Sequence, residues 1–286
     1  MEAVTDFFYQ YDSISRLVLI NCLLALSAYV SFSCGQFSVA TPGFMALGAY
    51  TAALLTLTLH WPFMVVLGAA IAVPALVAFL FGLPLLKLKG VYLAMATLGF
   101  VEVVHNLAIN MTFTGGAMGL MGIKAKTEIW HLILALAACI YLLWVIENSK
   151  LGAGLKSMAK DWQLARVLGV PLVRYNLIAF VLSAAIAGLA GGLSAHSSNA
   201  IIPGDFGFGL VIAILSFTIL GGVDRLWGPI LGALFLSILP EVARPFQEYR
   251  LIFTGALLLL AILFLKRGLA GFVEQLWRLA WPSRSH

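Results

Sequence analysis

The sequence predicts an all-α polytopic membrane protein, because most of its 286 residues fall into long apolar segments. Hydrophobic residues make up 62% of the chain and charged residues only 10%, whereas soluble proteins carry about 25% charged residues. The net charge of +5 comes from basic residues in short loops between the apolar segments. This distribution indicates membrane orientation rather than nucleic-acid binding.

A helix needs about 20 mostly apolar residues to cross the hydrocarbon core of a bilayer. About nine segments meet this criterion, and because two of them are short, the count lies between eight and ten. The segments are 16–34, 38–59, 63–86, 91–111, 130–146, 175–196, 206–221, 226–243 and 250–265. We therefore treat residues 1–286 as a single transmembrane domain.

The polar residues at the start of the chain and between the segments predict its orientation. No basic residue precedes Arg16, so the positively charged start of a cleavable signal peptide is missing and the first segment is expected to be retained. If the polar loop 147–174 is cytoplasmic, 12 of the 17 Lys and Arg residues lie on the cytoplasmic side. This excess predicts an outside N-terminus and a cytoplasmic C-terminus in the inner membrane.

Two apolar segments are preceded by helix breaks. Thr41 followed by Pro42 is typical of an N-cap with proline at the first helical position, which leaves residues 35–41 as irregular backbone. In a membrane such backbone persists only when it is buried or faces a watery cavity. A second break is expected at residues 227–229. Broken helices favour a transporter built from internal repeats, although ordinary helix starts explain both, and the two segments run in the same direction.

The segment 91–111 places polar residues on one helical face, at spacings of three and four: Glu102, His105, Asn106 and Asn110. A carboxylate in the middle of a span is costly unless it faces a partner or water, so Glu102 is a candidate site residue. The alternative is a structural hydrogen bond to His105 or to a neighbouring helix. The glycine-rich run 114–120 that follows predicts an outer loop, which either closes the path or turns the chain.

Two further segments have structural interpretations. Ala184, Gly188 and Gly192 recur at a spacing of four, which lets two membrane helices approach closely. The stretch 271–281 predicts an interfacial amphipathic helix at the C-terminal end, with Trp277, Trp281 and Arg278 near phospholipid head groups.

Several kinds of chemistry have no motif in the sequence. There is no phosphate-binding GxxxxGK[ST] loop, no HExxH and no GxSxG, so we expect neither ATP hydrolysis by that route nor an intramembrane enzyme. The three cysteines, Cys22, Cys34 and Cys139, have no metal or disulfide spacing. We expect no cofactor or metal on this chain, and the energy for transport must come from an ion gradient or from another chain.

The loop 147–174 is the one long polar interruption, and it contains an apolar stripe. The stripe consists of Leu151, Leu155, Met158, Trp162, Ala165 and Gly169. Gly169 and Pro171 supply a helix stop, and Asp161 is able to cap a second helix, so one bent helix and two short helices are both open. An exposed apolar stripe favours a groove on a partner protein, and the alternative is that it lies on the membrane surface.

The residues 159–170 (AKDWQLARVLGV), followed by the helix AFVLSAAIAGLAGGL, resemble the coupling loop and next helix of branched-chain amino acid ABC transporter permeases. The resemblance extends to GQFS at 35–38, FMALGAY at 44–50, YLAMATL at 92–98, TGGAMGL at 114–120 and LGGVDRLWGPILGA at 220–233. It favours the LivM-like branch over the LivH-like branch. The residues 39–42 depart from the glycine and histidine usual in the family.

The resemblance implies a heterodimer with a LivH-like permease, two cytoplasmic ATPase subunits that bind ATP and Mg, and an outside binding protein that delivers branched-chain amino acids. The expected ATPase-coupling residues are Leu155, Lys156, Met158, Lys160, Asp161, Trp162, Ala165, Leu168 and Gly169. The candidate path residues are Gln36, Ser38, Thr41, Thr97, Glu102, Asn106, Gly115 and Gly116. Two alternatives are an ion-coupled secondary transporter or channel for a small solute such as urea or amides, with Glu102 and His105 as coupling pair, and a non-transporting membrane scaffold.

Overall fold

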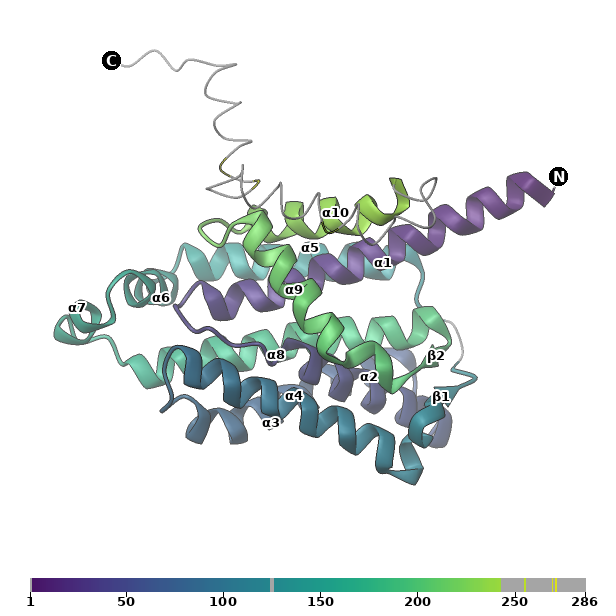
Figure 1. The fold of residues 1–286 in the computed structure, drawn as a ribbon, viewed down its shortest axis with the longest axis horizontal. Coiled ribbons are helices and arrows are strands. Elements are labelled where there is room, and N and C mark those ends of the chain that lie inside the picture. The colour runs from purple at the N-terminus through teal and green to yellow at the C-terminus, as the bar shows by residue number, and fades with distance from the viewer. Residues whose placement is uncertain (1, 124–125, 243–254, 256–268, 270, 272–286) are drawn as a thin grey trace, which may run out of the picture.

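The computed structural model describes residues 2–123, 126–242, 255, 269 and 271. This part of the chain is almost entirely helical (Figure 1). Its α-helices are α1 Glu2–Phe32, α2 Thr41–Thr58, α3 Phe63–Leu85, α4 Val91–Asn110, α5 Ile129–Glu147, α6 Lys150–Lys160, α7 Trp162–Val167, α8 Leu172–Ser198, α9 Phe208–Gly221 and α10 Trp227–Val242. Three 3-10 turns (η1 Thr112–Thr114, η2 Gly116–Met118, η3 Pro203–Phe206) and two short strands (β1 Leu120–Met121, β2 Ala200–Ile201) complete it.

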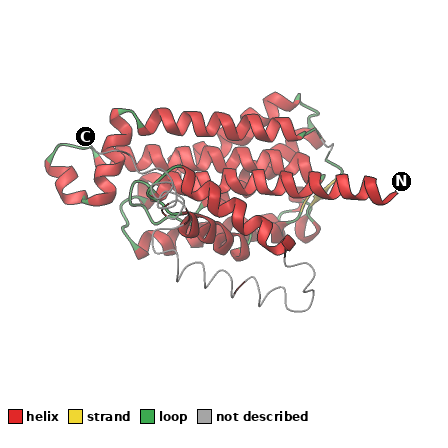
Figure 2. Ribbon diagram, turned by 90° about the horizontal axis from the view of Figure 1, so that it is seen from above, coloured by secondary structure: helices red, strands yellow, loops and turns green. Residues whose placement is uncertain are grey.

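Helix α8 lies in the middle of the bundle and packs against α1, α2 and α3. Small residues make this packing possible, because a side chain at Gly188 would meet the carbonyl oxygen of Ala70, and one at Gly191 would meet that of Met45. The predicted close packing at the small-residue stretch is thus confirmed. Figure 2 shows the long helices from above, running lengthwise with the two short helices at one end.

Six spans of the described chain are long and apolar enough to cross a membrane: Asp12–Phe32, Phe63–Leu85, Val91–Asn110, Ile129–Glu147, Leu172–Ser198 and Pro203–Gly221. The predicted count of nine is not confirmed. Helix α2 falls outside this group, since its 18 residues include four threonines, two glycines and a proline. The stretch Trp227–Pro240 is a shorter apolar helix. The predicted span 250–265 and the predicted interfacial helix 271–281 lie outside the described residues, except for Gly255 and Gly271.

The first predicted helix break exists, and the second lies a few residues before its predicted place. Residues 227–229 form the first turn of α10, and the non-helical residues are 222–226. Residues 33–40 form no helix between α1 and α2, but the N-cap of α2 is Ala40, which makes no side-chain cap bond, and Pro42 lies in the first turn. The prediction of Thr41 as N-cap was therefore wrong by one residue. At the second break Gly222 has a φ of 95°, a conformation that glycine adopts without strain. A side chain at Gly228 would meet the carbonyl oxygens of Gly221 and Gly222, which explains the tight turn into α10.

The loop predicted at 114–120 is confirmed as non-helical except for short 3-10 turns, and it lies at the end of the bundle away from α6 and α7. There β1 pairs with β2 in antiparallel register, Leu120 opposite Ile201 and Met121 opposite Ala200. Gly119 has a φ of 73°, and a side chain there would meet the carbonyl oxygen of Ile201. The backbones of the two segments therefore approach so closely at Gly119 that there is no space for a larger residue at this position.

Candidate functional site

The polar loop folds as two short helices, which settles the choice that the sequence left open. Ser149 caps α6 by accepting a hydrogen bond from the Gly152 N–H at 3.4 Å. Asp161 has an extended backbone and caps α7, with its carboxylate accepting from the N–H groups of Gln163 at 2.8 Å and Leu164 at 3.1 Å. Gly169, two residues after the end of α7, has a φ of 80°, and this left-handed residue is the predicted stop.

Helix α6 is held against the bundle by polar and steric contacts. The Tyr29 hydroxyl donates to Glu147 Oε1 at 2.7 Å, and the same carboxylate oxygen lies 3.1 Å from Lys156 Nζ. A side chain added at Gly154 would meet the ring of Tyr175. These contacts join α6 to α5 and α8 directly, and to α1 through Glu147.

Three of the six residues of the predicted apolar stripe are buried rather than exposed. Leu155 is 7% exposed, Met158 6% and Ala165 1%, all packed against the rest of the chain. The expectation that these three present a surface to a partner was wrong, because they belong to the core beneath α6 and α7. Lys156 and Lys160 are exposed, and their part in coupling stays a prediction.

Helix α7 instead presents a different apolar surface. Leu164 is 57% exposed, Val167 83% and Leu168 70%, and their spacing of three and four places them on one face. We call these three residues the α7 apolar patch. Trp162 is 43% exposed, and Lys89 Nζ lies 3.5 Å from the centre of its ring. The sequence does contain a signal for the patch, because Leu164, Val167 and Leu168 have the i, i+3, i+4 spacing of one helical face. The predicted stripe followed the spacing through Leu155 instead.

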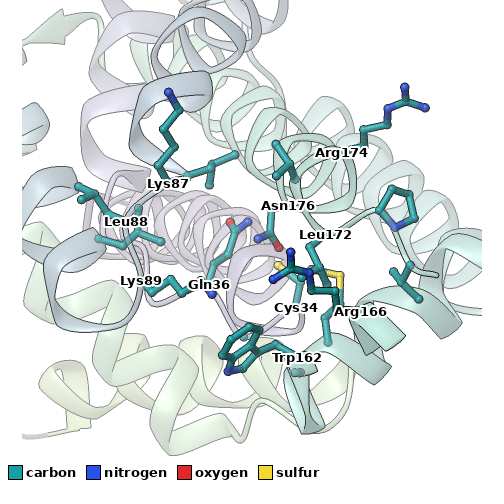
Figure 3. A pocket seen from close by; sticks show the side chains of 18 of the residues that line it. Cys34, Gln36, Lys87, Leu88, Lys89, Trp162, Arg166, Leu172, Arg174 and Asn176 are labelled. Atoms are coloured by element: carbon teal, nitrogen blue, oxygen red, sulfur yellow. The ribbon is translucent and has the colours of Figure 1, made fainter. Parts of the chain in front are cut away.

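The first helix break touches the same element. Gly35 has a φ of 79°, and a side chain there would lie 3.2 Å from the Cα of Ala159 in α6. Between these segments, the start of α8 and the α3–α4 loop lies a cavity of about 880 Å³, shown in Figure 3. The structure thus brings the irregular backbone of the break and the short helices together at one end of the bundle.

The candidate path residues fall into two groups. Gln36, Ser38, Thr41 and Thr97 are buried at the first break and on α4. Thr97 Oγ1 accepts a hydrogen bond from the Val39 N–H at 3.1 Å and donates one to the Leu93 carbonyl at 2.9 Å. Thr97 therefore fixes the break onto α4, and whether this group also faces the path stays a prediction.

The second group runs along the exposed face of α4. Glu102 Oε2 lies 3.9 Å from His105 Nδ1, which is an ion-pair distance and too long for a hydrogen bond. The Asn106 side chain donates to the Glu102 carbonyl at 2.8 Å and is exposed. Gly115 and Gly116 follow α4 in the chain, at the 3-10 turns η1 and η2. The structure does not bring this group together with the buried one.

No group of three or more His, Cys, Asp or Glu side chains that could hold a metal ion occurs in the described part of the chain. Its chemistry consists of a polar face on one membrane helix, a basic cavity, and a pair of short helices that end in an apolar patch. Together with the apolar spans, these features define a multi-pass α-helical membrane protein.

The comparisons agree with this class. The family model described as the permease component of the branched-chain amino acid transport system matches residues 10–262. The high-affinity branched-chain amino acid transport permease LivM of Salmonella typhimurium is 32% identical, with 88% of this chain and 68% of the relative covered. LivM of Escherichia coli K12 is also 32% identical, over 90% of this chain and 69% of the relative.

LivH of Escherichia coli K12 is 30% identical, over 52% of this chain and 48% of that protein. The chain therefore belongs to the branched-chain amino acid transport permease family, and its match to LivM over most of its length is typical of the LivM-like branch. The solved structure of PsaBC from Streptococcus pneumoniae in complex with Fab shares its fold, with a TM-score of 0.51, 13% identity, and 91% of this chain and 93% of that chain covered.

Proposed function

We propose that this chain is the LivM-type transmembrane subunit of an ATP-driven importer for branched-chain amino acids. It forms the translocation path with a LivH-like permease in the inner membrane, and two cytoplasmic ATPase subunits power it. A substrate-binding protein on the outside delivers the amino acid. In this arrangement α6 and α7 lie on the cytoplasmic side, together with the C-terminus, and the N-terminus lies outside.

The observation that carries this proposal is the α7 apolar patch. Leu164, Val167 and Leu168 are exposed, and α7 lies at one end of the bundle (Figure 1), between the candidate spans Ile129–Glu147 and Leu172–Ser198 in the sequence. A short helix with apolar anchors at this spacing suits a groove on another protein. Lys156 of α6 pairs with Glu147 of α5, which also accepts the hydrogen bond from Tyr29 of α1. Through these contacts α6 then transmits movement of α7 to the membrane helices.

The polar face of α4 supports a path between two permeases. Glu102 lies eleven residues into a 20-residue span, roughly 17 Å along the helix, and its side chain is 46% exposed in this chain alone. A carboxylate facing lipid at that depth is costly. The face that carries Glu102 and Asn106 therefore suits a partner subunit or a water-filled path better than lipid.

The relatives named LivM and LivH suggest the substrate class, branched-chain amino acids. The side chains of such substrates are apolar, and the buried residues next to the first break are also apolar, namely Val39, Val101 and Val211. An ATP-driven importer is independent of an ion gradient across the membrane, so no titrating group needs to be neutralised during transport.

The test is co-purification with the candidate partners, reconstitution into vesicles, and measurement of ATPase activity with and without binding protein and leucine. We expect ATPase activity to rise only when both are present. We also expect leucine to accumulate on the side of the vesicle membrane where the ATPase subunits lie, provided that ATP is present on that side. ATPase activity that is unchanged by binding protein with leucine, isoleucine or valine contradicts the proposed substrate class. Uptake that requires a proton or sodium gradient and no ATP contradicts the proposed mechanism.

The second candidate function is an ion-coupled transporter or channel for a small solute, because Glu102 and His105 form a pair on the exposed face of α4. Glu102→Gln separates the two proposals. In an ion-coupled transporter this variant abolishes dependence on the gradient, whereas in an ATP-driven importer ATPase stimulation by loaded binding protein persists even if uptake falls.

A further inference from the structure

The cavity at the end of the bundle carries a positive charge that the proposed transport function does not use. Four basic residues line it, Lys87, Lys89, Arg166 and Arg174, and no Asp or Glu is among its lining residues. The acidic groups of the neighbouring elements are engaged elsewhere. Asp161 caps α7, and Glu147 contacts Tyr29 and Lys156. An anion in this cavity therefore meets attraction on several sides.

Two helix N-termini open onto the same cavity. Leu172, Val173 and Arg174, the first turn of α8, line it, and α8 has no side-chain cap. Gly90, the N-cap of α4, also lines it, and α4 likewise lacks a side-chain cap. The first N–H groups of a helix have no partner within the helix, and the helix dipole adds partial positive charge there. Such N-termini are common sites for phosphate groups.

A buried amide without a partner points to an occupant. Gln36 is 4% exposed and lines the cavity, and neither its Oε1 nor its Nε2 has a hydrogen-bond partner. The Oδ1 atom of Asn176, which lines the same cavity, is also unpaired. Buried polar groups are nearly always hydrogen-bonded. Figure 3 shows both amides at the centre of the labelled side chains with Arg166 next to them in this view, whereas Lys87 and Arg174 extend outward at the edge.

The remaining lining favours a ligand that is charged at one end and apolar at the other. Burial raises the pKa of the Cys34 thiol to about 12, and backbone hydrogen bonds offset only part of this rise, so the thiol stays neutral and adds no negative charge. Leu88 and Val173, both exposed, line the cavity beside the basic residues. The cavity also lies at the ends of the candidate spans Phe63–Leu85 and Leu172–Ser198, where lipid head groups meet a membrane protein.

We propose that this cavity binds a phosphate-bearing anion, with the headgroup of an anionic phospholipid as its source. The volume of about 880 Å³ lies in the range of small-molecule sites, about 300–1,000 Å³. Arg166 belongs to α7 and the helix N-terminus to α8, so the bound phosphate would join α7 to the bundle. The inference does not depend on the proposed substrate or on ATP coupling.

The test measures lipid retention by native mass spectrometry of the full-length chain, purified in detergent and mixed with equal amounts of phosphatidylglycerol and phosphatidylcholine. We expect phosphatidylglycerol to be retained preferentially. Arg166→Gln and Gln36→Leu should each lower its affinity about tenfold, the effect of losing one charge-assisted or buried hydrogen bond. Lys150→Gln is the matched control, because Lys150 is exposed and does not line the cavity, and it should leave retention unchanged.

A second arm separates the two sources of phosphate. Inorganic phosphate is titrated into the lipid-free protein and detected by phosphorus NMR. Displacement of phosphatidylglycerol by phosphate in the wild type, but not in Arg166→Gln, supports one shared site. Saturable phosphate binding without retained lipid keeps the anion site and overturns the lipid source. Equal retention of the two lipids without phosphate binding, or an equal loss in Lys150→Gln, overturns the proposal, and none of these readouts involves transport.

Discussion

The two short helices of the polar loop differ in what they contact, although they are neighbours in the sequence. Helix α6 has Leu155 and Met158 buried and is joined to α1 and α5 through Tyr29 and Glu147. Helix α7 has one buried side chain, Ala165, and it exposes the α7 apolar patch. The first helix is part of the bundle, whereas the second is supported by the bundle and available to another protein.

In the proposed importer, this difference is what would let a partner bound to α7 act on the bundle. Without α6, a partner bound to α7 would move α7 but not the bundle. Without α7, the packed helix α6 would present no apolar surface for a partner to bind. Asp161 is the single residue between α6 and α7, and its backbone is extended. The exposed helix α7 therefore follows the packed helix α6 directly. Substitutions in α6 and α7 should therefore have different consequences.

The largest effect is expected for Leu155→Glu. The substitution places a carboxylate without a partner where the wild-type side chain is 7% exposed, and an uncompensated buried charge costs roughly 3 kcal/mol or more of folding stability. The measurement is the thermal midpoint of the full-length chain in detergent. Val167→Glu, at a residue 83% exposed, is the control and should leave the midpoint unchanged. Equal midpoints for the two variants would show that α6 is not anchored.

The next largest effect is expected for Leu168→Glu, which places a charge in the α7 apolar patch. A residue at the centre of an interface contributes about 2 kcal/mol or more, so affinity for the ATPase should fall roughly 30-fold. The thermal midpoint should not change, since Leu168 is 70% exposed. The measurement is ATPase retained on the immobilised permease.

The matched control for the patch is Gln163→Glu, which adds the same charge at an exposed residue of α7 outside the patch. It should bind the ATPase nearly as well as the wild type. If Leu168→Glu also binds normally, the patch is not the docking surface.

A smaller effect is expected for Tyr29→Phe, which removes the hydroxyl that donates to Glu147 at 2.7 Å. The loss of one such hydrogen bond costs about 1 kcal/mol. Hydrogen exchange should become faster at the amides of α6 but not at those of α3. Tyr141→Phe is the control, because that side chain lies exposed on α5. Unchanged exchange in α6 would mean that the Tyr29 contact does not hold the helix.

The sequence predicted those features that depend on local pattern. Length and apolarity located the spans of α1, α3, α4, α5, α8 and α9, because crossing a bilayer sets a minimum length. Short-range chemistry also sufficed at the ends of α7, where Asp161 supplies the cap and Gly169 the stop. These features require only residues that are close in sequence.

Features that depend on distant contacts were not predictable in the same way. The stripe predicted from Leu151 to Gly169 follows a single helical period, whereas the extended backbone at Asp161 changes the phase, so that Leu164, Val167 and Leu168 are exposed. A period also leaves open which face is buried. The contact between Tyr29 and Glu147 joins residues 118 positions apart, and the basic cavity draws on four separate segments.

The smallest effect concerns Cys34, which lies in the first helix break next to Gly35, the residue that approaches Ala159 of α6. Cys34 is 3% exposed, and burial raises the pKa of its thiol from 9.0 to about 12. Because the pKa of the thiol is higher in the folded state than in the unfolded state, its contribution to folding stability is complete below pH 9 and is lost as the pH rises toward 12.

Since the thiolate is the reactive form, Cys34 should resist maleimide at pH 7 in the folded chain and react after unfolding. A cysteine introduced by Val167→Cys is the control and should react at once. Rapid labelling of Cys34, measured by mass spectrometry, would show that water reaches the thiol in the folded chain.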